Sequence, residues 1–124
     1  MAATTSSEAM KNRTKQFALV VIRLCRSVPR TEESRIVTRQ LLRSATSVAA
    51  NYRAVCRARS KPDFVSKLGI VLEEADESLF WLELLVDTSN VPADRISVPL
   101  REANELVSIF VASLRTAKDL KSEI

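Results

Sequence analysis

The feature that most constrains the fold is a helical spacing of apolar residues along nearly the whole chain. Apolar side chains recur every three or four positions, as on one face of an α-helix. The pattern stops near Pro29, near Pro62 and at Asn90-Val91-Pro92. One glycine and four prolines in 124 residues are too few for a turn-rich β fold. The sequence therefore predicts an all-α protein of four helices joined by short links.

The first two helices are defined by apolar stripes and by end signals. Residues 1–7 are small and polar, lack this periodicity, and are predicted to be a disordered N-terminal segment. The first helix is predicted from Glu8 to Val28, which precedes a proline. Thr31 offers an N-cap for a second helix that lasts to about Arg59. The predicted stripes contain Met10, Phe17, Val20, Val21 and Leu24, and then Val37, Leu41, Ser44, Val48, Tyr52 and Val55.

The third and fourth helices follow from the same signals. Ser60 can cap the third helix, Pro62 fits its first turn, and Asp63 stands where a capping box needs its second partner. This helix is predicted to end near Thr88, and the fourth to begin within residues 94–97. Their apolar faces contain Phe64, Leu68, Val71, Ala75, Leu79, Leu82 and Val86, and then Leu100, Ala103, Leu106 or Val107, Phe110, Leu114 and Ala117.

The short links determine how the helices are arranged. Consecutive helices joined by a few residues must run antiparallel, which predicts an up-down-up-down four-helix bundle over residues 8–124. A chain of 124 residues forms one domain that can bury a core, and association with further copies would add buried area.

Charge is divided unevenly between the two halves of the chain. Residues 1–61 contain thirteen Lys and Arg against three acids, and residues 62–124 contain six against twelve. A net charge of +4 therefore combines a basic half with an acidic half. Either the two faces pair with each other, within or between subunits, or the basic half is available to a polyanion.

The composition argues against an enzyme and against a metal site. The chain has no histidine and no glycine-rich phosphate loop, and Cys25 and Cys56 are isolated, so we expect no catalytic centre and no cofactor. The acids of the third helix lack the Glu-x-x-His pairs that di-iron bundles use. The longest apolar run, residues 17–22, is too short to cross a membrane, and we expect a cytoplasmic protein.

Arginines are the best candidate for a binding function. Basic residues recur every four positions in two sets along the predicted second helix, which predicts two basic stripes on its surface. The sets are Arg35, Arg39 and Arg43, and then Arg53, Arg57 and Lys61. Guanidinium groups suit bidentate contacts to phosphate. Because exposed aromatic residues are not interleaved, we expect contacts to the RNA or DNA backbone with little base preference. The alternative is that these arginines pair with acids of the third helix across a subunit boundary.

Several polar residues lie on or beside the apolar stripes, where they need hydrogen-bond partners. We predict a structural polar pocket in which Glu77 is partly buried and has Arg43 or Asn51 as its partner. The pocket would contain Ser44, Ser47, Asn51 and Glu77, with Ser78 beside them. Tyr52 and Trp81 are predicted to be core or interface anchors.

Several short motifs of the second and third helices together are typical of one known family. They are Arg43-Ser44-Ala45, Ser47, Asn51-Tyr52-Arg53-Ala54, Arg59-Ser60, Phe64, Leu68, Glu73-Glu74-Ala75-Asp76-Glu77-Ser78 and Trp81-Leu82. In these motifs the chain resembles the four-helix-bundle proteins encoded in intervening sequences of bacterial 23S rRNA genes. The resemblance covers about residues 36–120, with a departure at Ala54 and Val55, where other members have glutamate and glycine.

The resemblance implies a left-handed antiparallel bundle that assembles as a ring-shaped homopentamer. The best-understood relatives are accessory proteins of diversity-generating retroelements, which are basic pentamers that bind nucleic acid and a reverse transcriptase. By similarity, the basic contacts would be Arg39, Arg43, Arg53 and Arg57, of which only Arg43 lies in the shared motif. A non-enzymatic binding protein and a purely structural scaffold both remain consistent with the sequence.

Overall fold

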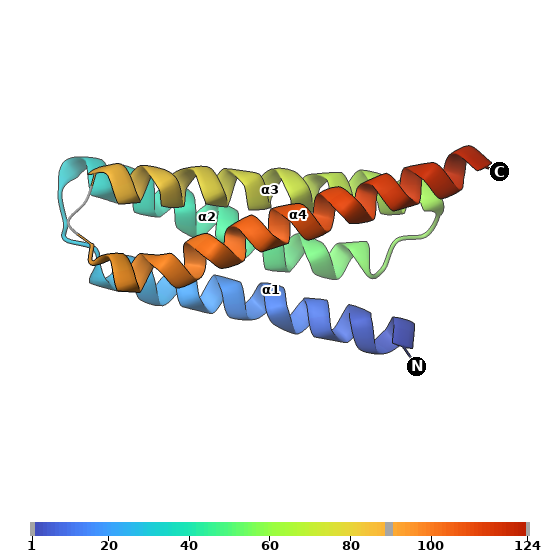
Figure 1. Cartoon of the computed structure of the whole chain (residues 1–124), viewed down its shortest axis with the longest axis horizontal. Helices are drawn as coiled ribbons and strands as arrows, with labels where there is room; N and C mark the ends of the chain where they lie inside the picture. Colours follow the sequence, from blue (N-terminus) through green and yellow to red (C-terminus); the bar gives the residue numbers. More distant parts are fainter. Residues whose placement is uncertain (1, 89–90, 124) are drawn as a thin grey trace.

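The computed structural model describes the backbone of residues 2–88 and 91–123 and the side chains of residues 7–88 and 91–119. It contains four helices, α1 (Ala2–Ser27), α2 (Glu32–Val55), α3 (Lys61–Thr88) and α4 (Ala93–Glu123), and the described residues form no strand. The α1–α2 and α3–α4 turns lie at one end of the molecule, whereas the α2–α3 link and both chain ends lie at the other (Figure 1). The predicted all-α, up-down-up-down bundle is confirmed.

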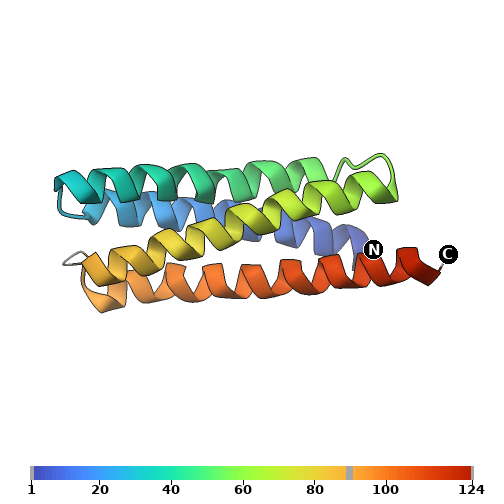
Figure 2. The same cartoon turned by 90° about the horizontal axis from the view of Figure 1, so that it is seen from above.

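Each helix packs on its neighbours in the sequence, and the bundle closes where α1 meets α4. Seen from above, α3 lies between α2 and α4 (Figure 2), which agrees with the direct packing of α3 on both. Figure 1 also shows that the N-terminal half of α1 diverges from the C-terminal half of α4. The bundle is therefore more open at the end that holds the chain termini.

α2 begins at a cap, and its C-terminal end differs from the sequence prediction. Thr31 and Ser34 form a reciprocal capping box at the start of α2. The helix ends at Val55 and not near Arg59, because the amides of Arg57 and Ala58 bond three residues back in tight turns. These turns separate α2 from α3 and form the link between the two helices.

Ser60 caps α3 as predicted, since its hydroxyl accepts from the Asp63 amide at 3.2 Å. The Asp63 carboxylate reaches back to the Arg59 amide at 3.1 Å. α4 begins at Ala93, close to the predicted start, and the predicted stop at Asn90 lies outside the described residues.

α1 begins at Ala2, six residues before the predicted start. Residues 2–7 contain no proline or glycine, so no residue in them breaks a helix that continues upstream from Glu8. The division of the chain into a disordered segment at 1–7 and a bundle at 8–124 remains a prediction.

The core is one cluster that receives a stripe from every helix. All predicted stripe residues of α2 are buried except Tyr52, which is half-buried with its ring centroid 6.0 Å from that of Phe110. On α3 the prediction of Val86 is wrong: Val86 is 47% exposed, whereas Leu85 is fully buried. The buried core includes Phe17, Val21, Leu24, Val37, Leu41, Ala45, Val48, Leu68, Val71, Ala75, Leu82, Leu85, Ala103, Leu106 and Phe110.

Candidate nucleic-acid interface

Of the four arginines predicted as nucleic-acid contacts, Arg39, Arg43 and Arg53 lie on α2. Arg57 was predicted on the same helix but lies in the tight turn after it, two residues beyond Val55. All four side chains are exposed. Their register follows from the helix itself, because residues four apart fall on nearly the same side. At 1.5 Å per residue, Arg39 and Arg53 are separated by about 21 Å along the helix axis. The structure thus spreads the four residues along α2 and the turn after it and does not gather them at one point.

Arg43 differs from the other three because it is engaged by two acids of α3. One guanidinium nitrogen lies 3.4 Å from Glu74, and another bonds to Glu77. The Arg43 side chain is 47% exposed and that of Glu74 only 20%. Arg43 therefore connects α2 to α3, and part of its hydrogen-bonding capacity is already used within the chain.

Arg39 lies at the end of the bundle where α1 turns into α2. It borders a hollow of about 450 Å³ together with Arg26, Arg30 and Arg35. Of the described residues that line this hollow, none is acidic. We call these four residues the arginine hollow. Sequence reasoning found only Arg39 and Arg35 on their helix, because joining them to Arg26 and Arg30 requires the geometry of the turn.

Arg53 lies in the last turn of α2, and Arg57 lies in the turn that follows the helix. They border a hollow of about 780 Å³ that also contains Arg59, Asp63 and Lys67. The acid in this group is already engaged, because Lys67 Nζ lies 2.7 Å from Asp63 Oδ2. The hydrogen bond from Lys67 lowers the pKa of Asp63. For Arg53 and Arg57, no ion pair is present in the part of the chain that the structure describes.

Arg53 also connects this region to α1. A second hollow, of about 480 Å³, lies between α1 and α2 and is bordered by Arg53, Lys11 and Lys15. Glu8 lines it as well and pairs with Lys11 at 2.8 Å. The outer α1–α2 surface is therefore basic near both of its ends.

The opposite side of α1 contains an ion-pair cluster that sequence reasoning missed. Arg13 donates to Glu102 at 2.6 and 2.8 Å and to Glu105 at 2.7 Å. The hydrogen bond to Glu102 raises the pKa of Arg13. The sequence signal that could have indicated this cluster is the pair of acids Glu102 and Glu105, three residues apart on the fourth helix. These contacts, with those of Arg43, show that the basic and acidic halves pair in part within one chain.

The predicted polar pocket is divided into separate contacts. Ser44 and Ser78 are both fully buried and their hydroxyl oxygens lie 2.9 Å apart, which joins α2 to α3. The Asn51 amide instead donates to the backbone carbonyl of Ser47 at 2.9 Å. Glu77 does not join this buried pair, because it contacts Arg43, one of its two predicted partners, at the surface.

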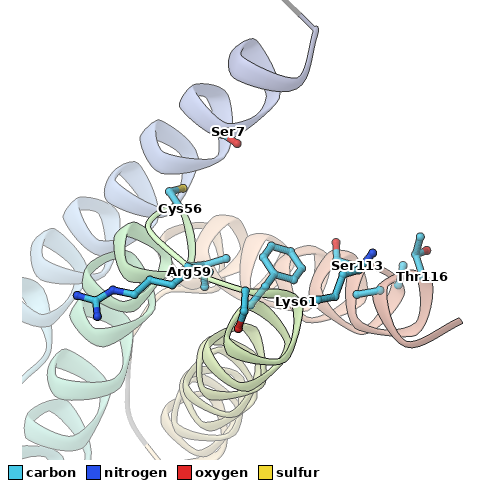
Figure 3. Close-up of a pocket in the computed structure, with 12 residues that line it drawn as sticks. Ser7, Cys56, Arg59, Lys61, Ser113 and Thr116 are labelled. Carbon is cyan, nitrogen blue, oxygen red and sulfur yellow. The ribbon is translucent and has the colours of Figure 1, made fainter. Parts of the chain in front are cut away.

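Another hollow, of about 860 Å³, lies beside the α2–α3 link, and of its described lining residues only Arg59 and Lys61 are charged (Figure 3). Lys61 extends toward Ser113 on α4, whereas Arg59 points to the other side of the link. Cys56 is exposed at its edge, and no described lining residue is acidic or a histidine that could act as its base. We find no assembled group for catalysis there.

The described residues contain no group of three side chains suited to a metal ion. They also contain no helix long and apolar enough to cross a membrane. Cys25 is half-buried, and burial raises its pKa to about 11, so it is a thiol at neutral pH.

Comparison with known proteins places the chain in a family. Residues 8–112 match the family described as 23S rRNA-intervening sequence protein. A solved structure from Bacteroides thetaiotaomicron, described as a protein with unknown function from the S23 ribosomal protein family, is 29% identical. The match covers 88% of this chain and 97% of that chain, with a TM-score of 0.77. No curated protein matches the sequence. Because the family match spans most of its length, the chain belongs to the 23S rRNA-intervening sequence proteins.

Proposed function

We propose that this protein is a non-enzymatic homo-oligomer that binds the phosphate backbone of RNA or DNA through the outer α1–α2 surface. The observation that carries the proposal is a set of exposed arginines, on α2 and in the turn directly after it, that have no acidic partner among the described residues: Arg39, Arg53 and Arg57. A cytoplasmic location accords with such a partner, and a nucleic-acid-bound protein such as a reverse transcriptase could share the same surface.

Backbone binding accounts for this surface better than base recognition does. Phosphate contacts supply affinity that does not depend on sequence, and arginine is well suited to them. Bases of single strands would need exposed aromatic platforms. On α2 the aromatic residue is Tyr52, which is half-buried and packs near Phe110. We therefore expect weak base preference.

Self-association is supported by apolar side chains that the single chain leaves in solvent. Phe80 is 51% exposed and Ile36 is 59% exposed. Beside Phe80, the indole nitrogen of Trp81 is buried and has no hydrogen-bond partner. Exposed apolar side chains are stabilised when a second copy covers them. A buried N–H group is stabilised when a neighbouring group supplies a hydrogen-bond acceptor. The number of subunits that the family resemblance implies, five, is part of the proposal.

The binding proposal is tested by filter binding of labelled duplex RNA and DNA at about 50 mM salt, where phosphate contacts are strong. We expect Arg53→Gln/Arg57→Gln to weaken retention of both duplexes. The matched control is Arg95→Gln/Arg101→Gln, which removes the same charge from exposed positions on α4. Equal weakening by the two double variants would indicate an effect of net charge alone, and no retention by the wild type would contradict the proposal.

A structural scaffold is the second candidate function. Glu73, Asp76 and Glu83 are exposed on α3, and their carboxylates have no ion pair within the described residues. They could receive the α2 arginines of a neighbouring subunit. Light scattering coupled to size exclusion distinguishes the two candidate functions. If the arginines pair with these acids between subunits, the oligomer dissociates at high salt. If the oligomer is held by apolar contacts such as Phe80, it keeps its mass at high salt and the arginines are available to phosphate.

A further inference from the structure

We propose that the arginine hollow, formed by Arg26, Arg30, Arg35 and Arg39, is a binding site for an oligophosphate group. The ligand class is an inorganic triphosphate or the di- or triphosphate group of a nucleotide. The site goes beyond the proposed backbone interface, with which it shares only Arg39.

The hollow lies where three chain segments meet. Arg26 comes from the last turn of α1, Arg30 from the link, and Arg35 with Arg39 from the first two turns of α2. Four cationic groups therefore border one space of about 450 Å³ from several directions. A ligand in this space can be contacted on more than one side, which a flat stripe of arginines does not allow.

No negative charge in the hollow offsets these cations. No ion pair involves any of the four arginines in residues 7–88 and 91–119. The nearest acids in sequence, Glu32 and Glu33, are exposed in the first turn of α2 and do not line the space. Like charges held around one hollow repel each other, and a multiply charged anion relieves this repulsion.

The remaining polar groups of the hollow are already engaged, so recognition depends on the guanidinium groups. Ser34 Oγ lies 2.7 Å from the Pro29 carbonyl oxygen, to which it can donate. Thr38 Oγ1 donates to the Ser34 carbonyl at 2.8 Å. Guanidinium groups bind phosphate oxygens in a bidentate manner, and they do so more strongly beside apolar side chains that exclude water. Val28 and Leu42 supply such side chains.

The turn itself is held in place before any ligand binds. Thr31 and Ser34 exchange hydrogen bonds of 2.8 and 3.1 Å, which fix the chain between Arg30 and Arg35. A preformed site loses less conformational entropy on binding. The hollow is compact, whereas phosphates of a duplex strand are spaced along an extended line, so a short oligophosphate fits the arrangement better than a duplex backbone does.

Isothermal titration calorimetry of the full chain with inorganic tripolyphosphate tests the site. We expect saturable binding with one site per chain, and affinity at least about tenfold lower in Arg26→Gln/Arg35→Gln. Arg101→Gln/Arg115→Gln is the matched control, since it removes the same charge from exposed positions on α4, outside both the hollow and the proposed backbone interface. Its affinity should change by less than about twofold, because distant exposed charges are screened.

ATP titrated in the same buffer distinguishes the two sources of the ligand. Equal affinity for ATP and tripolyphosphate indicates recognition of the phosphates alone, and tighter ATP binding indicates added contacts to the nucleoside. If Arg26→Gln/Arg35→Gln fails to fold by circular dichroism, Arg30→Gln in the link replaces it. No saturable tripolyphosphate binding, or equal losses in the hollow variant and the control, would overturn the proposal. Filter binding of duplex RNA and DNA is measured separately for the same variants. A failure of the oligophosphate proposal is therefore distinguishable from a failure of the proposed backbone interface.

Discussion

Replacing Arg43 tests whether this arginine is a structural connection between α2 and α3. Arg43→Met keeps most of the apolar stem but removes the guanidinium that contacts Glu74 and Glu77. Glu77→Gln, in contrast, leaves Arg43 paired with Glu74. The structure therefore predicts unequal costs for the two ends of the same contact.

The expected losses in the free energy of unfolding follow from how far each side chain is exposed to solvent. The Glu77 side chain is 39% exposed and pairs with a half-exposed arginine, so this contact contributes about 0.5 kcal/mol. Glu74 is only 20% exposed and one of its carboxylate oxygens is buried, so losing its cation costs about 1 kcal/mol more. We expect a loss of about 1.5 kcal/mol for Arg43→Met and about 0.5 kcal/mol for Glu77→Gln.

Thermal unfolding followed by far-UV circular dichroism measures both variants. For a chain of this size 1 kcal/mol shifts Tm by roughly 4 °C, which predicts decreases of about 6 and 2 °C. The double variant should resemble Arg43→Met, since Glu77 has by then lost its partner. A Glu77→Gln loss as large as that of Arg43→Met would refute the reasoning. An Arg43→Met variant as stable as the wild type would likewise show that the arginine is not a structural connection.

Three further predictions follow from burial and charge. Leu41→Ala, at a fully buried position of α2, should lower the free energy of unfolding by about 2–5 kcal/mol in urea titrations. At pH 8, Cys25 should react with a thiol reagent roughly a hundredfold more slowly than exposed Cys56, because burial raises its pKa to about 11; similar rates would contradict its burial. The pKa of Asp63 is lowered in the folded state, so its contribution to stability is present above its ordinary value of 3.8 and lost as pH falls through the folded value. Asp63→Asn should remove that part of the acid dependence.

The helices and the core were predictable because apolar spacing and capping residues are local signals. The remaining errors occur where local signals allow two answers. Leu82 can be followed on the core face by Leu85 or Val86, and the drift of a straight helix would favour Val86. The buried positions of α3 instead keep the alternating three- and four-residue steps of a seven-residue repeat, which selects Leu85. The end of α2 at Val55 depends on tight turns in residues that contain no strong breaker.

The candidate site was predictable only in part, since its chemistry depends on register between helices. The sequence places Arg43 and Arg53 on one helix but does not show that acids 31 and 34 residues away engage Arg43. It likewise cannot show that Arg26 and Arg39 border one hollow. Sequence patterns therefore identify the residue types of the surface, and the packing determines which of them remain available.

The salt dependence of duplex binding tests the central claim most directly. Each phosphate neutralised by Arg39, Arg53 or Arg57 releases counterions, so log affinity should fall linearly with log salt at a slope of about −0.9 per contact. We predict that Arg53→Gln/Arg57→Gln reduces this slope by up to about two for each engaged subunit, while Arg95→Gln/Arg101→Gln leaves it unchanged. A slope that is the same in wild type and in Arg53→Gln/Arg57→Gln would contradict the assignment of the α1–α2 surface as the nucleic-acid interface.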